Sequence, residues 1–382
     1  MTEVWDLVVV GAGPAGSAAA LGALTSRPGT RVLMLDRSGF PRDKACGDGI
    51  APHVLDVLAG VGVTGLLDDR TPVHELRLRQ GAIEVARTMA RPAWVVPRSV
   101  LDARLVEAAV HAGAELRRRR VRTVSRDGAA VVLDGDIRAR VVVGADGAHS
   151  LLRSEAGLAA PSRQAFALRG YAPTPPGRTG QQVIVFGETR QSSYAWSFDR
   201  GDGLANVGYG ELLGPGRQTP TRQLLQRLAE LLPGSTDGGT AWRGHHLPLS
   251  AWTFQQPDGP VLLVGDAAGL INPMTGEGIY YAVETGVLAG RAAADALERG
   301  SGASAGAAYR GAVRSTLGRH FKHTSVTSRL VSVPAVVNAG IRGAGRRQGV
   351  FDDLVEVGLG RGLVTRRVVT GLVSGLRPPF PR

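Results

Sequence analysis

The first forty residues alternate between apolar runs and short polar interruptions. Residues 7–10 and 31–36 are mostly apolar, and an Ala-rich stretch at 17–24 follows a glycine-rich turn at 11–16. Continuous apolar runs are typical of parallel strands that are covered on both faces, and the Ala-rich stretch has the length of a short helix. The pattern therefore predicts a strand, turn, helix and strand at the start of the chain.

Two later segments of the chain are also continuously apolar. Apolar strands are expected at 139–143 and 261–264, and a helix is expected from an N-cap at Ser99 to about Gly113. Between about 166 and 252 apolar and polar residues alternate between Gly and Pro turns, which predicts an antiparallel sheet. We therefore expect an α/β fold with a discontinuous cofactor domain at 1–74, 98–160 and 259–300, a substrate-binding sheet domain at 75–97 and 161–258, and a helical, Arg-rich C-terminal region at 301–382 that ends in a frayed tail.

Composition fits a globular chain of this size. Of the 382 residues 43% are apolar and 20% are charged, which allows two packed domains. The formal net charge is +12, and nearly all cations are Arg, with Lys only at Lys44 and Lys322. The Arg clusters are not interleaved with stacking aromatics, so nucleic-acid binding is not expected. Neither is metal binding, because His245 and His246 would point to opposite faces of a strand without further ligands.

The cysteine count and the hydropathy bear on location. Cys46 is the single cysteine, so an internal disulfide framework is excluded, and the start of the chain lacks the pattern of a signal peptide. No apolar run reaches the 18 residues that a membrane span needs, but residues 330–341 are apolar enough to touch a bilayer. We expect a cytoplasmic protein with peripheral membrane contact left open.

The glycine turn carries a dinucleotide-binding pattern. Gly11, Gly13 and Gly16 form G-x-G-x-x-G between a strand and a helix, which suits a tight turn, close approach to a pyrophosphate and tight helix packing. Asp36 ends the next strand, 20 residues after Gly16, where a carboxylate can accept hydrogen bonds from a ribose 2′-OH. Pro14, Ala15 and Arg37 adjoin these positions and are included in the expected cofactor site.

Two further motifs distinguish FAD from NAD. Val143-Gly144-Ala145-Asp146-Gly147 and Gly265-Asp266-Ala267-Ala268 each follow a buried strand. Together with the glycine turn they resemble the FAD-binding domain of the p-hydroxybenzoate hydroxylase superfamily. The resemblance implies that Asp266, after Gly265, holds the ribityl chain of FAD, and that Asp146 and Gly147 support the site.

The stretch after Asp266 reads as the start of a long helix. Asn272-Pro273-Met274-Thr275-Gly276-Glu277-Gly278-Ile279 precedes helical residues to about Leu297, and free N–H groups at this start can face the flavin pyrimidine. Pro273, Gly276, Gly278 and Ile279 are therefore expected to contact the cofactor. Only one dinucleotide pattern is present, so NAD(P)H or another reductant, including an electron-donor protein, is expected to dock transiently.

Residues 40–49 (FPRDKACGDG) and 96–102 (VPRSVLD) look like the geranylgeranyl reductase family within this superfamily, and YAWSF at 194–198 with ANVG at 205–208 resembles its lipid-pocket motif. The likeness covers roughly residues 4–300. It implies a flavoenzyme that hydrogenates isoprenoid double bonds of an apolar small molecule. It also implies that Lys44, Ala45, Cys46, Gly47 and Arg98 lie at the cofactor.

Chemistry suggests roles for a few of these residues. Tyr194, Trp196 and Phe198 alternate along a strand and would share one face, either as a flat wall for an apolar substrate or as ordinary sheet core. Cys46 can donate a proton or tune the pocket, or can be a small buried hydrophobe. Arg42 and Lys44 can lower its pKa, meet an anionic head group, or remain solvated. We predict Cys46, Tyr194 and Trp196 as catalytic residues.

Some positions depart from the family pattern and keep alternatives open. Gln191 and Asp199 stand where the family motif usually has prolines, so the substrate need not be a long polyprenyl chain, and Asp199 needs solvent or a cationic partner. A monooxygenase of the same superfamily is the second hypothesis, although Gly269 and residues 276–279 differ from the usual hydroxylase pattern. Flavin halogenases come third, and a non-enzymatic flavin-binding or membrane-associated scaffold is a hypothesis of a different class.

Overall fold

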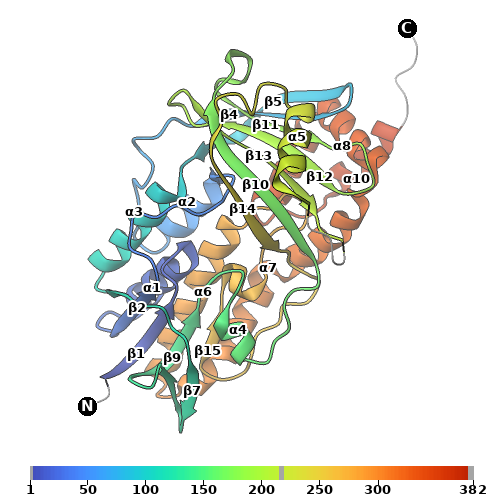
Figure 1. Cartoon of the computed structure of the whole chain (residues 1–382). Helices are drawn as coiled ribbons and strands as arrows, with labels where there is room; N and C mark the ends of the chain where they lie inside the picture. Colours follow the sequence, from blue (N-terminus) through green and yellow to red (C-terminus); the bar gives the residue numbers. More distant parts are fainter. Residues whose placement is uncertain (1–2, 215–218, 377–382) are drawn as a thin grey trace.

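The computed structural model describes residues 3–214 and 219–376 and is organised around two sheets (Figure 1). The first sheet has the strand order β6-β2-β1-β9-β8-β7, with β15 also paired to β9. Its β6, β2, β1, β9 and β15 run parallel, as the continuous apolar runs predict, and β7 and β8 add an antiparallel edge. The strands are β1 (Glu3–Val10), β2 (Val32–Asp36), β6 (Glu115–Arg118), β7 (Val124–Asp127), β8 (Ala130–Leu133), β9 (Ile137–Gly144) and β15 (Val261–Leu263).

The second sheet has eight strands in the order β14-β10-β13-β12-β11-β4-β5-β3. The alternating pattern predicts an antiparallel sheet. The observed sheet is mixed, because β4 pairs parallel to β11. The β4–β5 hairpin comes from an earlier part of the chain and reaches β11 in the same direction. The strands are β3 (Gly49–Ile50), β4 (Val73–Gln80), β5 (Ile83–Val95), β10 (Gln164–Pro173), β11 (Gln181–Phe186), β12 (Ser193–Asp199), β13 (Leu204–Leu212) and β14 (Thr240–Pro248).

Two Ala- and Gly-rich helices form the centre of the part built on the first sheet, which we call the first unit. α1 (Pro14–Ser26) packs tightly on α6 (Ile279–Glu298), and a Cβ added at Gly290 would lie 2.1 Å from the Ala19 carbonyl oxygen. Such close contact requires glycine at the crossing and anchors α6, whose start lies at the cofactor motifs. The remaining helices of this part and of the second sheet are α2 (Pro52–Ala59), α3 (Arg98–His111), α4 (Leu151–Glu155) and α5 (Thr221–Leu231).

The expected helix start at Ser99 is wrong by two residues. The N-cap is Pro97 and Arg98 is already helical. Pro97 has no N–H to lose at a helix start, and the Asp102 carboxylate one turn later balances the cationic Arg98 side chain at the positive end of the helix. The preference of serine for the N-cap position is therefore outweighed by this ion pair and by Pro97.

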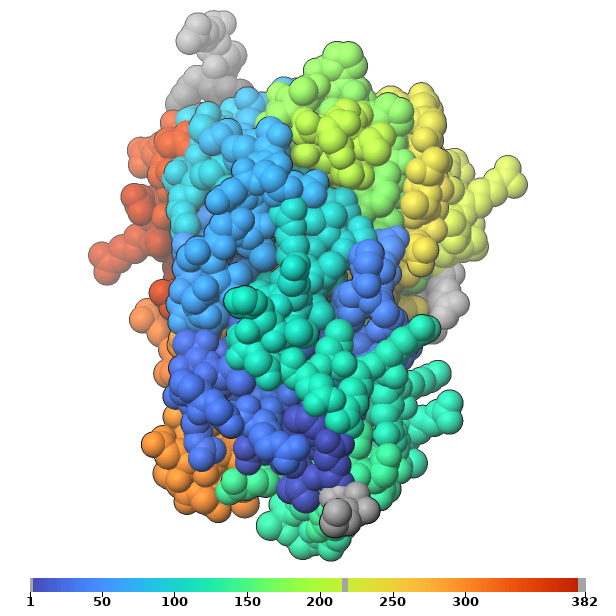
Figure 2. Space-filling model, turned by 90° about the vertical axis from the view of Figure 1, so that its left-hand side faces the viewer, coloured from blue at the N-terminus to red at the C-terminus, as the bar shows by residue number. Residues whose placement is uncertain are grey.

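The C-terminal region is helical, as expected, as far as the structure describes it. Its elements are α7 (Ala305–Leu330), α8 (Pro334–Arg346), α9 (Gln348–Leu359) and α10 (Arg366–Leu376). α8 and α9 pack on β5 through a cluster that includes Met89, Ile341 and Phe351. Seen from the side, the blue to teal segments make up most of the surface and the orange and red helices emerge at its edge (Figure 2). The tail at 378–382 lies outside the described residues.

None of the helices in the described ranges is both long and apolar enough to cross a membrane.

Candidate functional site

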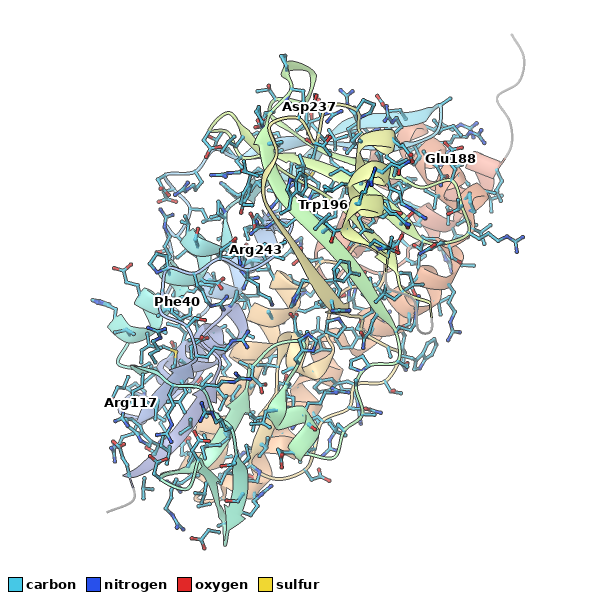
Figure 3. All side chains as sticks on the ribbon, in the orientation of Figure 1. Phe40, Arg117, Glu188, Trp196, Asp237 and Arg243 are labelled. Carbon is cyan, nitrogen blue, oxygen red and sulfur yellow. The ribbon has the colours of Figure 1, made fainter. Side chains whose placement is uncertain are left out.

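A large cavity of about 1540 Å³ joins the two sheets and the C-terminal helices. Its lining includes the glycine turn after β1, the loop at 42–51, one face of the second sheet and the loop before α6. Trp196 lies within the second sheet and Arg243 nearer the first unit (Figure 3). The motifs that the sequence separates by up to 270 residues therefore surround one space.

The glycine turn has the geometry that its pattern predicts. Gly11 has a φ of +99°, and a Cβ there would lie 2.3 Å from the Ala145 carbonyl oxygen, so no other residue fits. A Cβ at Gly16 would lie 1.8 Å from the Gly11 carbonyl oxygen. Asp36 fixes the turn, since its Oδ2 accepts a hydrogen bond from the Ala12 amide at 2.9 Å.

Two guanidinium groups lie beside the turn. A Cβ at Gly13 would meet Nη2 of Arg42 at 3.1 Å and Nη2 of Arg98 at 3.9 Å. Both arginines are held by Asp102, which Arg98 contacts through two hydrogen bonds of 2.6 and 2.9 Å and Arg42 through an ion pair of 3.1 Å. The backbone amides at the start of α1 and these two cations form a cradle that suits a pyrophosphate.

Asp146 stabilises the turn between β9 and α4. Its carboxylate accepts hydrogen bonds from the Ser150 hydroxyl at 2.5 Å and the Leu151 amide at 2.7 Å, so it holds the start of α4. Gly147 follows with a φ of +83°, which lets the loop turn along the cavity. Asp146 and Gly147 thus shape this turn where it lines the cavity.

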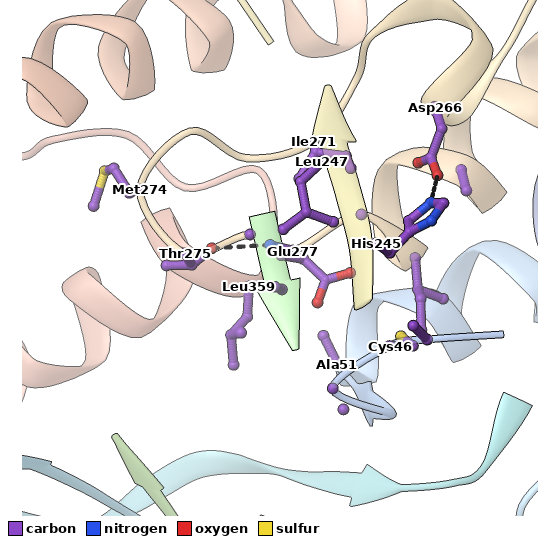
Figure 4. A pocket seen from close by; sticks show the side chains of 18 of the residues that line it. Cys46, Ala51, His245, Leu247, Asp266, Ile271, Met274, Thr275, Glu277 and Leu359 are labelled. Atoms are coloured by element: carbon purple, nitrogen blue, oxygen red, sulfur yellow. Dashed lines mark hydrogen bonds and ion pairs between the residues drawn. The ribbon is translucent and has the colours of Figure 1, made fainter. Parts of the chain in front are cut away.

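Asp266 is paired with a residue from the other end of the domain. Lys44 Nζ donates to its Oδ2 at 2.9 Å. His245 Nε2 lies 3.9 Å from the same oxygen (Figure 4). Burial alone would raise the pKa of Asp266, but the Lys44 ammonium and His245 outweigh it and hold the pKa well below its ordinary value. The carboxylate is therefore ionised and oriented within the cavity.

Lys44 and Arg42 do not activate Cys46, contrary to one of the expected roles. Both cations are engaged elsewhere, Lys44 with Asp266 and Arg42 with Asp102. Burial raises the pKa of the Cys46 thiol, and the Arg98 charge offsets this only in part. Cys46 therefore lines the cavity as a neutral thiol.

A buried polar network joins the Cys46 loop to the second sheet. Asn206 Nδ2 donates to the Cys46 carbonyl at 2.8 Å and to Asp48 Oδ2 at 2.9 Å, while its Oδ1 accepts from Trp196 Nε1 at 2.8 Å. The Tyr171 hydroxyl also donates to Asp48 at 2.5 Å. Burial raises the pKa of Asp48 to about 6, although both hydrogen bonds lower it. The network fixes the loop against the sheet.

The aromatic residues of β12 share one face, as predicted. Ring centroids are 5.8 Å apart for Tyr194 and Trp196 and 6.4 Å apart for Trp196 and Phe198, and all three side chains line the cavity. The Tyr194 hydroxyl donates to the Thr275 carbonyl at 2.5 Å, which ties this wall to the loop before α6. They are thus a wall of the site and not merely sheet core.

The loop before α6 contributes an acid that the sequence analysis did not single out. Glu277 lines the cavity, and its Oε1 accepts a hydrogen bond from the Tyr280 amide at 2.8 Å. A charged residue between two glycines, directly before an apolar helix, was the available signal. α6 itself begins at Ile279, which lines the cavity, whereas the Tyr280 amide donates to Glu277 and is not one of the expected free N–H groups.

Most of the predicted site residues line the cavity. Gly16, Gly265 and Pro273 do not. Gly16 packs beneath Gly11, and a Cβ at Gly265 would lie 3.2 Å from the Ala15 side chain, so these two serve packing behind the site. The lining members are Gly11, Gly13, Pro14, Ala15, Asp36, Arg37, Lys44, Ala45, Cys46, Gly47, Arg98, Asp146, Gly147, Tyr194, Trp196, Asp266, Gly276, Gly278 and Ile279.

Asp199 does not place a charge in the apolar part of the site, nor does it pair with an arginine. Its carboxylate accepts hydrogen bonds from the Thr174 hydroxyl at 2.9 Å and the Gly180 amide at 2.7 Å. Asp199 therefore has a structural role, because these hydrogen bonds fix the C-terminal end of β12. Within the described ranges, no group of three or more His, Cys, Asp or Glu residues is arranged to hold a metal ion.

Comparison with known proteins agrees with this geometry. Residues 3–189 match the family model described as FAD binding domain. The chain is 35% identical over 311 residues to a menaquinone reductase of Mycolicibacterium smegmatis, covering 74% of this chain and 75% of that protein. It is 30% identical over 359 residues to digeranylgeranylglycerophospholipid reductase 2 of Methanopyrus kandleri, covering 86% and 87%.

Among solved structures, a geranylgeranyl bacteriochlorophyll reductase-like protein from Thermoplasma acidophilum superposes with a TM-score of 0.75, covering 99% of this chain and 97% of that one. The sequence identity is 21%, so this likeness shows a shared fold.

Proposed function

Since this chain belongs to the geranylgeranyl reductase family of FAD-dependent oxidoreductases, we propose that it uses reduced FAD to hydrogenate a carbon–carbon double bond in an isoprenoid or a similar apolar metabolite. The observation that carries the proposal is the continuity of the cavity. The cofactor motifs, the aromatic wall of β12 and an apolar end between the C-terminal helices line one space.

The residues around the glycine turn fit FAD. The Gly13 backbone with Arg42 and Arg98 suits the pyrophosphate, Asp36 lies where a ribose hydroxyl would bind, and Asp266 suits the ribityl chain. The positive dipole end at the start of α6 suits the electron-rich side of the reduced ring. When bound, the reduced cofactor supplies a hydride, and the protein must position the alkene and exclude water.

The apolar end of the cavity supports a substrate with a long hydrocarbon part. Beyond the aromatic wall, the lining consists almost entirely of aliphatic side chains from the second sheet and the C-terminal helices. These are Leu76, Leu78, Ile184, Val331, Val336, Val337, Ile341, Leu354, Val355, Leu359, Val364, Val368, Leu372 and Val373. A chain of isoprene units matches such a surface, and the two named reductase relatives support this substrate class.

Within the site we assign the substrate contacts as follows. Tyr194 and Trp196 form the flat surface on which the alkene lies, and their polar groups are already satisfied by Thr275 and Asn206, so the faces stay free for apolar contact. Cys46 lines the same space as a neutral thiol and shapes the reacting end. Together they keep the double bond in a dry environment.

We also propose that electrons reach FAD from a transiently docked donor, either NAD(P)H or an electron-donor protein. The support is the single dinucleotide pattern in the sequence, which FAD itself would occupy. The exposed Arg37 beside Asp36 and the net charge of +12 favour an acidic donor.

Peripheral membrane contact is a further proposal. An apolar face on α7, α10 and the turn before α8 contains side chains that are 42–57% exposed, and Arg329 and Arg366 lie beside it. Four of these side chains also line the cavity, so an apolar substrate in a bilayer would meet the cavity there. The face consists of Leu330, Val333, Val369, Val373 and Leu376.

The deciding experiment is mass spectrometry of polyprenyl alkenes, including a menaquinone and a geranylgeranyl lipid, incubated with the dithionite-reduced holoenzyme without oxygen and then in air. A gain of two hydrogens without oxygen supports the proposal. A gain of one oxygen atom, in air alone, would overturn it in favour of a monooxygenase.

A further inference from the structure

Six acidic side chains line the cavity, and five of them are tied down. Hydrogen bonds or ion pairs hold Asp36, Asp43, Asp48, Asp146 and Asp266. Glu277 differs. Its Oε1 accepts a hydrogen bond from the Tyr280 amide, and no cation of the described chain lies within ion-pair distance of it. The Glu277 carboxyl group is therefore held by backbone amides at the start of α6 and reaches the cavity without a charged partner.

Glu277 is fixed beside the aromatic wall. The Thr275 hydroxyl accepts a hydrogen bond from the Glu277 amide at 3.3 Å, and the Thr275 carbonyl accepts one from the Tyr194 hydroxyl at 2.5 Å. A Cβ at Gly276 would lie 2.9 Å from the Tyr194 oxygen. Figure 4 shows the Glu277 carboxyl group extending into the pocket, on the side where Cys46 and Ala51 lie. Thr275 thus joins the acid to the aromatic wall.

The environment keeps a proton on Glu277 near neutral pH. Burial raises its pKa to about 7, against the lowering effect of the Tyr280 and Ile279 amides and of His53. The other ionisable groups that act on it electrostatically are Cys46, Tyr194 and Tyr281, and burial keeps all three neutral by raising their pKa values. A group with a pKa near the working pH is best suited to give up and regain a proton.

We propose that Glu277 is the catalytic acid that protonates the substrate double bond. The inference rests on the proposed function and specifies the proton source that the function requires. The O–H bond of Glu277 breaks, and its proton forms a C–H bond at one alkene carbon. The hydride that reduced FAD supplies forms the second C–H bond, which leaves a saturated product, oxidised FAD and a Glu277 carboxylate that regains a proton from water.

Cys46 is the competing proton donor. Its thiol has a pKa raised above an ordinary value that is already 9.0, so it is a weaker acid than Glu277. For proton transfer to an unactivated alkene the stronger acid gives the larger driving force. Cys46 then shapes the pocket while Glu277 supplies the proton.

The test is Glu277→Gln in the holoenzyme. Glutamine keeps the size of the side chain and an oxygen that accepts the Tyr280 hydrogen bond, but it has no acidic proton. Alkene reduction should fall by about 100-fold or more, while the FAD titration stays unchanged and the thermal unfolding temperature does not fall. The matched control is Glu284→Gln, which removes a carboxyl group on α6 whose pKa is also raised by burial but which does not line the cavity.

A second readout does not depend on turnover. Infrared difference spectra of the cofactor-free protein, titrated with acid and base, should show a carboxyl group with a pKa near 7 in the wild type and in Glu284→Gln, and its loss in Glu277→Gln. Should Glu277→Gln fold poorly, Glu277→Asp keeps the acid at shorter reach and should retain about a tenth of the rate.

The outcomes separate the two proposals. Wild-type enzyme that reduces no alkene overturns the proposed function and this inference with it. Wild-type turnover with Glu277→Gln within threefold of it, or a Glu277 carboxyl that titrates in the ordinary range, overturns the inference alone.

Discussion

Lys44 Nζ lies 2.9 Å from Asp266 Oδ2, although 222 residues separate the two in the chain. This ion pair joins the loop after β2 to the turn after β15, and both side chains are less than a third exposed. It therefore connects two motifs of the FAD-binding domain, and its removal should be felt in cofactor affinity.

Lys44→Met is expected to raise the Kd for FAD by about tenfold or more, because it leaves the Asp266 carboxylate in the cavity without its cation. Fluorescence titration of FAD into the cofactor-free protein measures this. Lys322→Met is the matched control, since it removes the other lysine of the chain from the exposed surface of α7. Equal FAD affinity in the two variants would contradict the prediction.

Asn206→Leu should lower the free energy of unfolding by about 3 kcal/mol, because it leaves the Trp196 N–H, the Cys46 carbonyl and Asp48 without their shared partner in a buried place. Urea unfolding followed by tryptophan fluorescence measures the loss. Asn338→Leu is the comparison, since Asn338 is half-buried and does not line the cavity. A loss no larger than in that variant would refute a structural role for the network.

Asp48 gives stability a pH dependence of defined sign. Its pKa is about 6 in the folded chain, above the ordinary 3.8, so the unfolded chain ionises first as pH rises. The contribution is complete below pH 3.8 and is lost by the time the pH passes 6. Between about pH 4 and 7 the wild type should lose about 3 kcal/mol relative to Asp48→Asn.

Asparagine suits this position, because Asp48 has a φ of +59° and asparagine tolerates that region. Urea unfolding of both proteins at a series of pH values gives the difference. A difference that stays constant with pH would show that Asp48 titrates normally.

Gly340→Phe should narrow the apolar end of the cavity. Gly340 lines it on α8, and a Cβ there meets nothing closer than the Leu372 side chain at 3.7 Å, so the new ring has room to enter. We expect kcat/KM to fall about tenfold for a geranylgeranyl substrate but to stay unchanged for a two-unit analogue. Gly311→Phe, at a glycine of α7 with open space around it, should affect neither substrate.

The apolar face on α7, α10 and the turn before α8 is testable with vesicles of phosphatidylglycerol and phosphatidylcholine. The wild type should float with them at low salt, and Val369→Glu combined with Val373→Glu should reduce the bound fraction about fivefold. Val110→Glu, at an exposed valine on α3, is the control. Flotation that is the same for all three proteins would exclude this face as the contact.

The parts of the site that could be predicted are those that local pattern determines. The spacing of Gly11, Gly13 and Gly16 after an apolar strand fixes a turn, and the period of two places Tyr194, Trp196 and Phe198 on one face. Both depend on neighbours in the sequence. The family resemblance added the position of Asp266, which no local rule supplies.

The parts that were missed depend on distant partners. Proximity in the sequence suggests that Lys44 acts on Cys46, but Lys44 pairs with Asp266. Glu277 looks like a loop residue until the fold surrounds it with the cavity. The helical pattern after residue 301 gives no sign that α8 and α10 would complete a pocket whose other walls lie hundreds of residues earlier.

The cavity has a redox end and an aliphatic end that come from different parts of the chain, and this separation affects how such a protein can diversify. The redox end is built from the glycine turn, the Cys46 loop and the start of α6, whereas the aliphatic end is built largely from helices added after this core. Selection or design can therefore lengthen, shorten or reshape the second region while the electron chemistry is conserved. Tail length and hydride transfer become separately adjustable traits of a single enzyme.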